Sequence, residues 1–361
     1  MSDDVHDVVV IGAGQAGLVT AYCLQQRGIN PLILEAAPDI GSVWRGRYDS
    51  LKLFTPSQYS NLPGLSFPSK PDQYPTKDEV ADYLVSYAKN FGFDVRHDCP
   101  VDRLSKTDNV FAIRAGRKTF HARAVIVATG ALQRPAIPDF AAKLLNSVYQ
   151  CHSSAYYNAQ QLPDEDVLVV GAGNSGAQIA EELARTGRRV SVSIDQWPRS
   201  LPQRILGKDI FWWLLKAGII STKPAGITGS TAKTPIPTIG TNLKRLCNKG
   251  LIDCVPRVVG ADDGRLLLAD GSTLSPSAVI WATGFRNDFS WIDIEGATDK
   301  DTPLHQRGVS PVAGLHFIGL PFLYSKGSAF LGFVADDARH VATAAAYRLD
   351  SLSQETFLYQ L

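Results

Sequence analysis

Two glycine-rich hexapeptides of the same type carry the clearest chemical signal in this sequence of 361 residues. The first follows the apolar run 8–11 and reads Gly12-Ala13-Gly14-Gln15-Ala16-Gly17. The second follows the apolar run 167–170 and reads Gly171-Ala172-Gly173-Asn174-Ser175-Gly176. A tight glycine turn between a strand and a helix presents backbone N–H groups on which a pyrophosphate can bind. The pairing therefore predicts two dinucleotide sites, held so that electrons can pass between them.

An acidic residue ends the next strand after the first glycine turn. The buried segment 31–35 closes with Glu35, 18 positions after Gly17. A carboxylate at this place accepts hydrogen bonds from ribose hydroxyls and repels a 2′-phosphate, as suits the adenosine half of FAD or NAD. Because strand, turn, helix, strand and acid all occur in order, the motif predicts dinucleotide binding and not a solvated strand end.

The acidic position after the second glycine turn gives a conflicting signal. The strand predicted at 189–194 is followed by Asp195, which favours NAD(H). Arg199 and Arg204 lie beyond it, and an arginine that swings back could pair with the 2′-phosphate of NADP(H). Asp195 as an ordinary exposed acid is a further alternative. The nicotinamide preference stays open at this point.

The elements that must position these residues follow one order in both halves. For the first half we predict helices at 16–26 and 77–90, a β-meander of 101–104, 109–115 and 118–123, and a strand at 124–127. For the second half we predict a helix at 177–185, a strand at 189–194, a meander of 251–255, 265–268 and 272–274, and a strand at 279–281. A tail strand at 315–319 and a helix at 336–349 return to the first half. The order predicts an α/β fold with two Rossmann-like dinucleotide-binding domains, the second inserted in the first.

Composition excludes several other classes. The chain is 45% hydrophobic and 20% charged with a net charge of +1, which gives no general attraction to nucleic acid or anionic lipid. The five cysteines form no C-x-x-C pair, which argues against a disulfide framework and a metal site, and most are expected to be buried hydrophobes. The start carries no signal peptide, and the longest apolar stretch, 211–220, is shorter than the roughly 20 residues of a membrane span. We therefore expect a cytoplasmic protein without stable membrane insertion.

Together, these motifs give a specific resemblance over nearly the whole chain. The motifs that carry it, in chain order, are Gly12 to Gly17, Glu35, Gly41-Ser42-Val43-Trp44-Arg45, Gly171 to Gly176, and Ala282-Thr283-Gly284-Phe285. In this the chain resembles the class B flavin-dependent monooxygenases, which include flavin-containing and Baeyer–Villiger monooxygenases, and looks most like their short bacterial members.

The resemblance implies a glutathione-reductase-like flavoprotein with FAD on the first fingerprint and NADPH and/or NADH on the second. The FAD-binding domain would span 1–140 and 286–361, and the NAD(P)H-binding domain 141–285. Trp44 and Arg45 would line the flavin and nicotinamide region, Thr55 and Gln58 would approach the flavin ring, and Thr129 and Thr283 would sit where the chain crosses between domains. Further cofactor contacts are implied at Ala36, Val43, Val101, Ala128, Gly130, Asp195, Gln196, Trp197, Arg199 and Gly284. Arg45 and Thr55 are the implied catalytic residues.

The sequence departs from the family pattern at three places. Of the signature Phe-x-Gly-x-x-x-His-x-x-x-Tyr or Phe, His152 and Tyr156 are present but the first two positions are not. We expect His152 to brace the linker and not to transfer protons. Gln196 stands where many members carry an arginine for the 2′-phosphate, so we expect relaxed selectivity with NADH usable. Thr55 stands where an asparagine is common beside the flavin, and is the implied hydrogen-bond donor to a flavin peroxide.

The implied reaction transfers a hydride from NAD(P)H to FAD, forms a C4a-(hydro)peroxyflavin with O2, and passes one oxygen to a small organic substrate. Sulfoxidation, N-oxidation and Baeyer–Villiger oxidation all remain open, and a homodimer is possible. The alternative is an NAD(P)H-dependent flavoprotein reductase of the quinone or ferredoxin type. A disulfide reductase is disfavoured because the sequence has no C-x-x-C or C-x-x-x-x-C pair. A flavin-bearing sensor is disfavoured because a sensor need not keep the second fingerprint.

Overall fold

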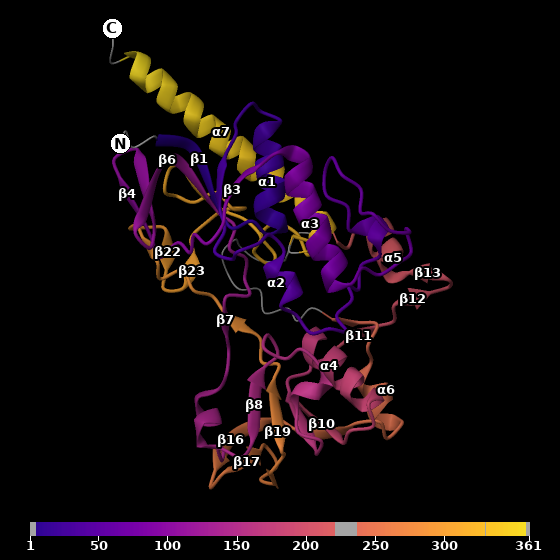
Figure 1. Cartoon of the computed structure of the whole chain (residues 1–361). Coiled ribbons are helices and arrows are strands. Elements are labelled where there is room, and N and C mark those ends of the chain that lie inside the picture. Colours follow the sequence, from indigo (N-terminus) through magenta and orange to yellow (C-terminus); the bar gives the residue numbers. More distant parts are fainter. Residues whose placement is uncertain (1–4, 221–236, 329, 359–361) are drawn as a thin grey trace.

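Two main sheets, a larger mixed one and a smaller parallel one, are joined by two crossings of the chain (Figure 1). The computed structural model describes residues 5–220, 237–328 and 330–358. The segment between Ile219 and Gly240 is rich in glycine, proline, serine and threonine, which predicts a loop, and its residues 221–236 lie outside the described residues. The α/β fold class predicted from the sequence is confirmed.

The larger sheet has the strand order β21-β4-β5-β6-β1-β2-β3, and β24 pairs with β6. Its strands are β1 (Val5–Ile11), β2 (Leu32–Leu34), β3 (Asp94–Arg96), β4 (Arg103–Thr107), β5 (Val110–Ala115), β6 (Lys118–Val127), β21 (Ile292–Asp293) and β24 (Leu315–Phe317). β3, β2, β1, β6 and β24 pair in parallel, so their carboxyl ends meet at one edge. The strands predicted at 118–123 and 124–127 form one strand, and the tail strand joins this sheet.

The smaller sheet is parallel throughout, in the order β15-β10-β9-β19-β8. Its strands are β8 (Tyr149–His152), β9 (Val167–Val170), β10 (Val190–Ile194), β15 (Asp253–Pro256) and β19 (Ala278–Trp281). The prediction that 251–255 opens a meander is wrong, because β15 pairs in parallel with β10. The meander beside this sheet consists of β16 (Val258–Asp262), β17 (Arg265–Leu268) and β18 (Thr273–Leu274).

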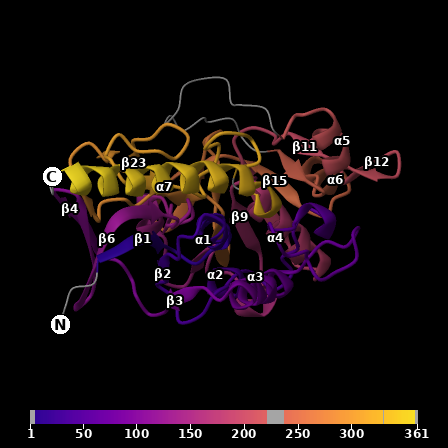
Figure 2. The same cartoon turned by 90° about the horizontal axis from the view of Figure 1, so that it is seen from above.

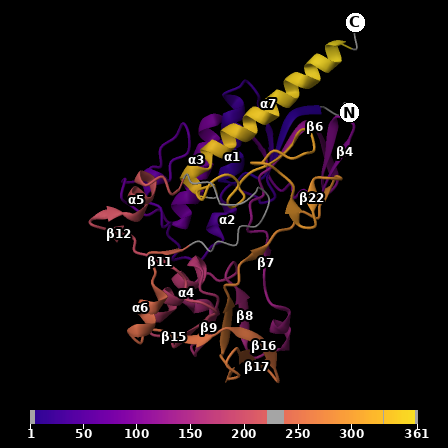
Figure 3. The ribbon, with the colours of Figure 1, turned by 180° about the vertical axis from the view of Figure 1, so that it is seen from behind.

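Helices cover the larger sheet more completely than the smaller one. The main helices are α1 (Gln15–Gln25), α3 (Lys77–Phe91) and α7 (Ala335–Leu358) on the larger sheet, and α4 (Asn174–Arg185) and α6 (Leu243–Asn248) on the smaller. α7 packs along α1, as Figures 2 and 3 show. The sequence Thr76-Lys77-Asp78-Glu79 predicts a capping box at the start of α3, and the structure has one: Thr76 Oγ1 accepts from Glu79 N, and the Glu79 carboxylate accepts from Thr76 N.

Two antiparallel strands, β7 (Arg134–Pro135) and β20 (Phe285–Arg286), carry the chain between the sheets. Thr283 Oγ1 donates to the carbonyl oxygen of Ala136 at 2.5 Å, which ties the two crossings together.

Short helical elements are α2 (Ser42–Arg45), α5 (Ile210–Lys216) and the 3-10 turns η1 (Ser57–Tyr59), η2 (Asp139–Lys143), η3 (Ala159–Gln161) and η4 (Leu331–Phe333). Short strand pairs are β11 (Ser200–Leu201) with β14 (Thr238–Ile239), β12 (Arg204–Ile205) with β13 (Lys208–Asp209), and β22 (Thr298–Asp299) with β23 (Thr302–Pro303). Within the described ranges, no helix is long and apolar enough to cross a bilayer.

Candidate functional site

Each of the three glycines of the first fingerprint is required for a different structural reason. Gly12 has φ of +110°, and a Cβ there would meet the carbonyl oxygen of Ala128 at 2.7 Å. A Cβ on Gly17 would overlap the carbonyl oxygen of Gly12, so only glycine lets α1 pack against its own turn. A Cβ on Gly14 would meet nothing within 4 Å, so the space beside this backbone is open. These are the roles of tight turn, close packing and ligand approach in a dinucleotide fingerprint.

The second fingerprint repeats this geometry. Gly171 also has φ of +110° and faces the carbonyl of Ala282, and a Cβ on Gly176 would overlap the carbonyl oxygen of Gly171. Gly173 again has open space within 4 Å. Ala128 directly follows β6 and Ala282 directly follows β19, and each is followed by Thr-Gly, so Thr129-Gly130 and Thr283-Gly284 border the two loops.

Both fingerprint helices begin without a cap. The N-cap residues of α1 and α4 are Gly14 and Gly173, neither makes a side-chain capping bond, and neither helix has an acidic residue in its first turn. α3, by contrast, has its capping box. Uncapped first-turn N–H groups and the positive end of the helix dipole suit an anionic ligand. The residues present therefore fit a dinucleotide phosphate at each loop.

Glu35 holds the first loop directly. Its Oε2 accepts from the backbone N–H of Ala13 at 2.7 Å, and its Oε1 accepts from the N–H of Ala37 at 2.9 Å. The carboxylate is half-buried, and Ala36 beside it is exposed. Val101 lies farther along the chain and packs against the core of the larger sheet. The strand-end acid is thus part of the loop's own framework.

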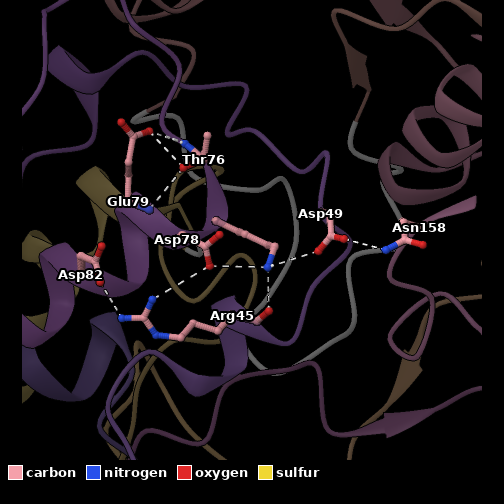
Figure 4. A network of polar contacts seen from close by, with 8 residues as sticks. Arg45, Asp49, Thr76, Asp78, Glu79, Asp82 and Asn158 are labelled. Carbon is pink, nitrogen blue, oxygen red and sulfur yellow. Dashed lines mark hydrogen bonds and ion pairs between the residues drawn. The ribbon is translucent and has the colours of Figure 1, made fainter. Parts of the chain in front are cut away.

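The α2 segment is anchored on α3 by an ion-pair network (Figure 4). Arg45 pairs with Asp82 at 2.5 Å and reaches Asp78 at 4.0 Å. These contacts engage the Arg45 guanidinium with carboxylates of α3. Trp44 packs against the core of the larger sheet, whereas Val43 is 62% exposed.

A buried lysine connects this network to the segment between β8 and β9 of the smaller sheet. Lys77 is 8% exposed, and its Nζ donates to the carbonyl oxygen of Arg45 at 2.9 Å. Asp49 lies 3.6 Å from that Nζ and accepts from Asn158 Nδ2 at 2.7 Å (Figure 4). Sequence reasoning missed this chain of contacts, because its members are scattered polar residues without a motif.

Two further contacts fasten the loop after α2 to α4. Tyr48 donates to Gln178 at 2.5 Å, and Ser50 donates to Glu182. The same Glu182 accepts from Tyr156 at 2.9 Å, which places this signature tyrosine at the junction. Burial raises the pKa of Tyr48 and Tyr156, so both hydroxyls are protonated donors. The segment 45–50 is therefore held by both halves of the molecule.

Thr55 is buried and directly follows Phe54, which belongs to a cluster of aromatic rings. Thr55 is 4% exposed, and its Oγ1 accepts from Ser60 Oγ at 3.1 Å. The ring of Phe54 stacks on Phe211 with centroids 6.0 Å apart and meets Phe330 edge-on at 5.6 Å. Gln58, three residues on, is exposed and donates to Asp72 at 3.1 Å. Thr55 is thus buried and is the sequence neighbour of the aromatic wall that Phe54, Phe211 and Phe330 form, whereas Gln58 lies at the surface.

The acid after the second fingerprint has a basic partner. Asp195 Oδ2 lies 3.6 Å from Arg257 Nη1, and both side chains are more than 60% exposed. Arg257 follows β15, which runs parallel beside β10, so both residues stand at the same strand ends. Sequence reasoning missed Arg257 because it placed the preceding strand in a meander.

The remaining residues predicted at this site differ in their contacts. Asn174 is occupied by the chain itself, since its Nδ2 donates to Pro237 O at 3.3 Å and its Oδ1 accepts from Ile239 N at 3.2 Å. Ser175, Gln196 and Arg199 are exposed, and Trp197 is 44% exposed. The loop after β10 is therefore open to solvent.

His152 lies at the return crossing, as predicted. Its Nε2 lies 2.8 Å from the carbonyl oxygen of Gly284, and its Nδ1 lies 2.8 Å from Ser154 Oγ. Its ring meets Phe285 edge-on. Burial lowers the pKa of His152, which favours the neutral ring. The interactions are those of a brace between β8 and β20.

Comparison with known proteins places this chain in a family. Residues 9–204 match the pyridine nucleotide-disulphide oxidoreductase family. An uncharacterized oxidoreductase CzcO-like of Geobacillus kaustophilus is 45% identical over 339 residues, covering 93% of this chain and 97% of the relative. A probable indole-3-pyruvate monooxygenase of Arabidopsis thaliana is 30% identical over 360 residues, covering 87% of this chain and 82% of the relative.

A solved structure agrees with the sequence comparisons. The flavin-containing monooxygenase from Stenotrophomonas maltophilia superimposes with a TM-score of 0.79 at 26% identity, covering 95% of this chain and 99% of that one. Fold, both glycine loops and sequence relatives agree. The chain therefore belongs to the pyridine nucleotide-disulphide oxidoreductase family and, within it, is an oxidoreductase of the flavin monooxygenase type.

Proposed function

We propose that the protein is an FAD-dependent monooxygenase that uses NADPH or NADH. The observation that carries this proposal is the matched geometry of the two glycine loops, each with an open backbone beside its second glycine and an uncapped helix. FAD is assigned to the loop at Gly12, because Glu35 and the larger sheet build that site. The nicotinamide nucleotide is assigned to the loop at Gly171. The FAD-binding domain would then comprise 1–140 and 286–361, and the NAD(P)H-binding domain 141–285.

The chain's own residues would act mainly by binding and positioning. The uncapped N-termini of α1 and α4 would hold the pyrophosphates, and Glu35 would orient the first loop and the ribose beside it. Trp44 and the aromatic wall around Phe54 would exclude water near Thr55, whose hydroxyl is the candidate donor to the reacting oxygen. When bound, FAD would supply hydride acceptance and the activation of O2.

The substrate proposed is a small organic molecule with an oxidisable sulfur, nitrogen or ketone carbon. The wall of Phe54, Phe211 and Phe330 favours an apolar substrate body at that place. Reaction type within this class stays a prediction, as do the cytoplasmic location and the homodimer.

Labelled oxygen tests the proposal. Holoenzyme supplied with NADPH and 18O2 is incubated with a thioether, a tertiary amine and a cyclic ketone, and products are analysed by mass spectrometry. We expect one 18O atom in at least one product, with oxygen uptake that matches product. Nucleotide oxidation that yields only H2O2 or reduced quinone, with unlabelled substrates, would instead establish the reductase alternative.

Nicotinamide selectivity is proposed to be relaxed. Asp195 suits the free ribose hydroxyls of NADH, while Arg257 beside it can pair with the 2′-phosphate of NADPH. Steady-state kinetics with both nucleotides should give kcat/KM values within about a thousandfold of one another. A larger preference for NADPH would contradict this assignment.

A further inference from the structure

A segment after α2 fastens the two halves of the molecule to one another, apart from the two crossings of the chain. β7 and β20 pair with each other, so the crossings form one narrow ribbon. The segment 48–51, the strap, belongs in sequence to the half built on the larger sheet. Tyr48 is nevertheless 4% exposed within the apolar core of the smaller sheet, and Leu51 packs against that core. The strap thus contributes side chains to the core of the other half.

One side of the strap is held by the start of α3. Leu51 O accepts from Lys77 N at 3.2 Å. The buried Nζ of Lys77 donates to Arg45 O at 2.9 Å and lies 3.6 Å from Asp49 Oδ1. α3 packs against α1, the helix that begins at the first glycine loop. The strap is therefore fixed to the elements that form the first dinucleotide site.

The other side of the strap is held by the segment between β8 and β9. The N–H of Asp49 donates to Tyr157 O at 2.8 Å, and Asp49 Oδ2 accepts from Asn158 Nδ2 at 2.7 Å (Figure 4). The Asp49 carboxylate therefore faces an ammonium of one half with one oxygen and an amide of the other half with its second oxygen. Hydrogen bonds to a charged group are roughly twice as strong as neutral ones, so this carboxylate orients both partners.

The strap also reaches the helix of the second glycine loop. Tyr48 donates to Gln178 and Ser50 donates to Glu182, and both acceptors belong to α4. The N-cap of α4 is Gly173, the second glycine of that loop. The strap therefore connects α3 with α4 and, through them, the two loops that are assigned to different dinucleotides.

We propose that Asp49 and Asn158 are positioning residues for hydride transfer between the two dinucleotides. The inference rests on the proposed function, which assigns FAD to the loop at Gly12 and the nicotinamide nucleotide to the loop at Gly171. Because the two bind to different sheets, the distance between their reacting atoms depends on how the halves are held. Reacting atoms must lie about 3–3.5 Å apart, and a misplacement of about 1 Å costs on the order of a hundredfold in rate. The bond between Asp49 and Asn158 closes the strap on the smaller half and so sets this distance.

Exchanging the two polar groups of this bond tests the proposal. Asn158→Asp keeps the oxygen that accepts from Gln160 N at 3.1 Å, but places a carboxylate against that of Asp49. The double variant Asp49→Asn with Asn158→Asp restores the hydrogen bond with donor and acceptor exchanged, and keeps an oxygen for Lys77. Asn90→Asp, at the exposed far end of α3, carries the same chemical change away from the strap and is the matched control.

Anaerobic stopped-flow reduction of the holoenzyme by NADH and by NADPH gives the first readout. In Asn158→Asp the limiting rate of flavin reduction should fall at least about fivefold. FAD content and the nucleotide concentration for half-maximal rate should stay within about twofold of wild type. The double variant should recover the limiting rate to within about twofold, and Asn90→Asp should keep it. A residue that only stabilises the fold would not produce this split and rescue. No oxygen and no organic substrate take part, so the result is independent of whether oxygen is transferred.

Hydrogen–deuterium exchange of the same holoproteins gives a second readout that involves no reaction. The peptide that contains Asp49 should exchange faster in Asn158→Asp and return to the wild-type rate in the double variant, because the Asp49 N–H loses and regains Tyr157 O. An unchanged limiting rate in Asn158→Asp would overturn the proposal, whether or not exchange becomes faster. So would a limiting rate that stays low in the double variant although exchange is restored. Wild-type holoenzyme that neither nucleotide reduces would overturn the proposed function as well.

Discussion

The loops at Gly12 and at Gly171 have the same backbone and different surroundings. Both have a first glycine at φ of +110°, a third glycine packed on the first, and open space at the second. Eight of the eleven residues of α1 are buried, because the helix lies between the larger sheet and α7, but only five of the twelve residues of α4 are. Glu35 is held by two backbone N–H groups, while Asp195 is exposed and pairs with Arg257.

The different surroundings of the two loops explain how one motif can hold two kinds of ligand. A fingerprint whose helix and acid are fixed by surrounding structure pre-organises a site, which favours a cofactor that stays bound. A fingerprint whose acid and loop face solvent allows a nucleotide to enter and leave. We therefore expect changes at the first loop to affect folding and flavin content, and changes at the second to affect nucleotide kinetics alone.

Alanine at the third glycine of each loop should give the largest effect. In Gly17→Ala the new methyl would overlap the Gly12 carbonyl, which is rigid backbone, so the turn must open. We expect the free energy of unfolding to fall by more than about 4 kcal/mol. The folded yield should drop with it, and FAD content per chain should be at least tenfold lower. Gly176→Ala meets the Gly171 carbonyl in the same way, but should keep its flavin and lose nucleotide-dependent reduction. Flavin absorbance and thermal unfolding measure both.

Gly14→Ala and Gly173→Ala are the matched controls. Neither new methyl meets an atom of the protein within 4 Å, so unfolding free energies should change by no more than about 1 kcal/mol. Affinity for FAD should fall in the first variant and affinity for the nucleotide in the second. If Gly176→Ala lost the flavin and Gly17→Ala retained it, the assignment of cofactors to loops would be reversed.

A buried histidine should make the first region sensitive to acid. His316 of β24 is 3% exposed with neither ring nitrogen hydrogen-bonded, and burial, followed by the nearby His340, lowers the pKa of His316 to about 4. The unfolded chain binds this proton near pH 6.5 and the folded chain does not, so the free energy of unfolding falls as pH drops from 6.5 to 4. The loss amounts to about 3 kcal/mol at pH 4.

His316→Leu should remove this loss while leaving stability at pH 8 nearly unchanged. Burial raises the pKa of Asp337 and so acts in the opposite direction, but it is common to both proteins and cancels in their difference. Denaturant unfolding at pH 8, 6 and 4 gives the comparison. His152 of the smaller sheet, which has two hydrogen-bond partners, provides a contrast in the second region. Equal acid sensitivity in the wild type and His316→Leu would contradict the assignment.

Substituting the two strand-end acids compares the sites directly. In Glu35→Gln one oxygen is replaced by an NH2 group that faces a backbone N–H donor, which costs about 1–3 kcal/mol. If the same cost falls on the FAD complex, affinity for FAD should drop roughly tenfold to a hundredfold. Asp195→Asn removes only an exposed ion pair, worth about 0–1 kcal/mol, and should change stability little. Isothermal titration of apoprotein with FAD tests the first, and thermal unfolding the second.

Much of this architecture could be predicted, because periodicity and glycine turns are local. Both fingerprints, α1, α3 and the strands that flank them follow from patterns within about twenty residues. The strand at 253–256 was misplaced because its partner, β10, is about sixty residues away and pairing direction leaves no local pattern. The network of Lys77, Asp49 and Asn158 could not be predicted for the same reason: single polar residues from distant segments meet only after folding.

Arg257 gives the smallest predicted effect and the most selective one. Its guanidinium lies 3.6 Å from Asp195 at the ends of adjacent parallel strands, where the ribose of a bound nucleotide belongs. Arg257→Ala should raise the KM for NADPH about threefold to tenfold and leave that for NADH unchanged, because only NADPH carries the 2′-phosphate. Arg265→Ala, an exposed arginine on β17, is the matched control and should alter neither value. An equal rise of KM for NADPH and for NADH in Arg257→Ala would mean that the arginine supports the loop and does not select the nucleotide. The exposed loop after β10 would then hold both nucleotides in the same way.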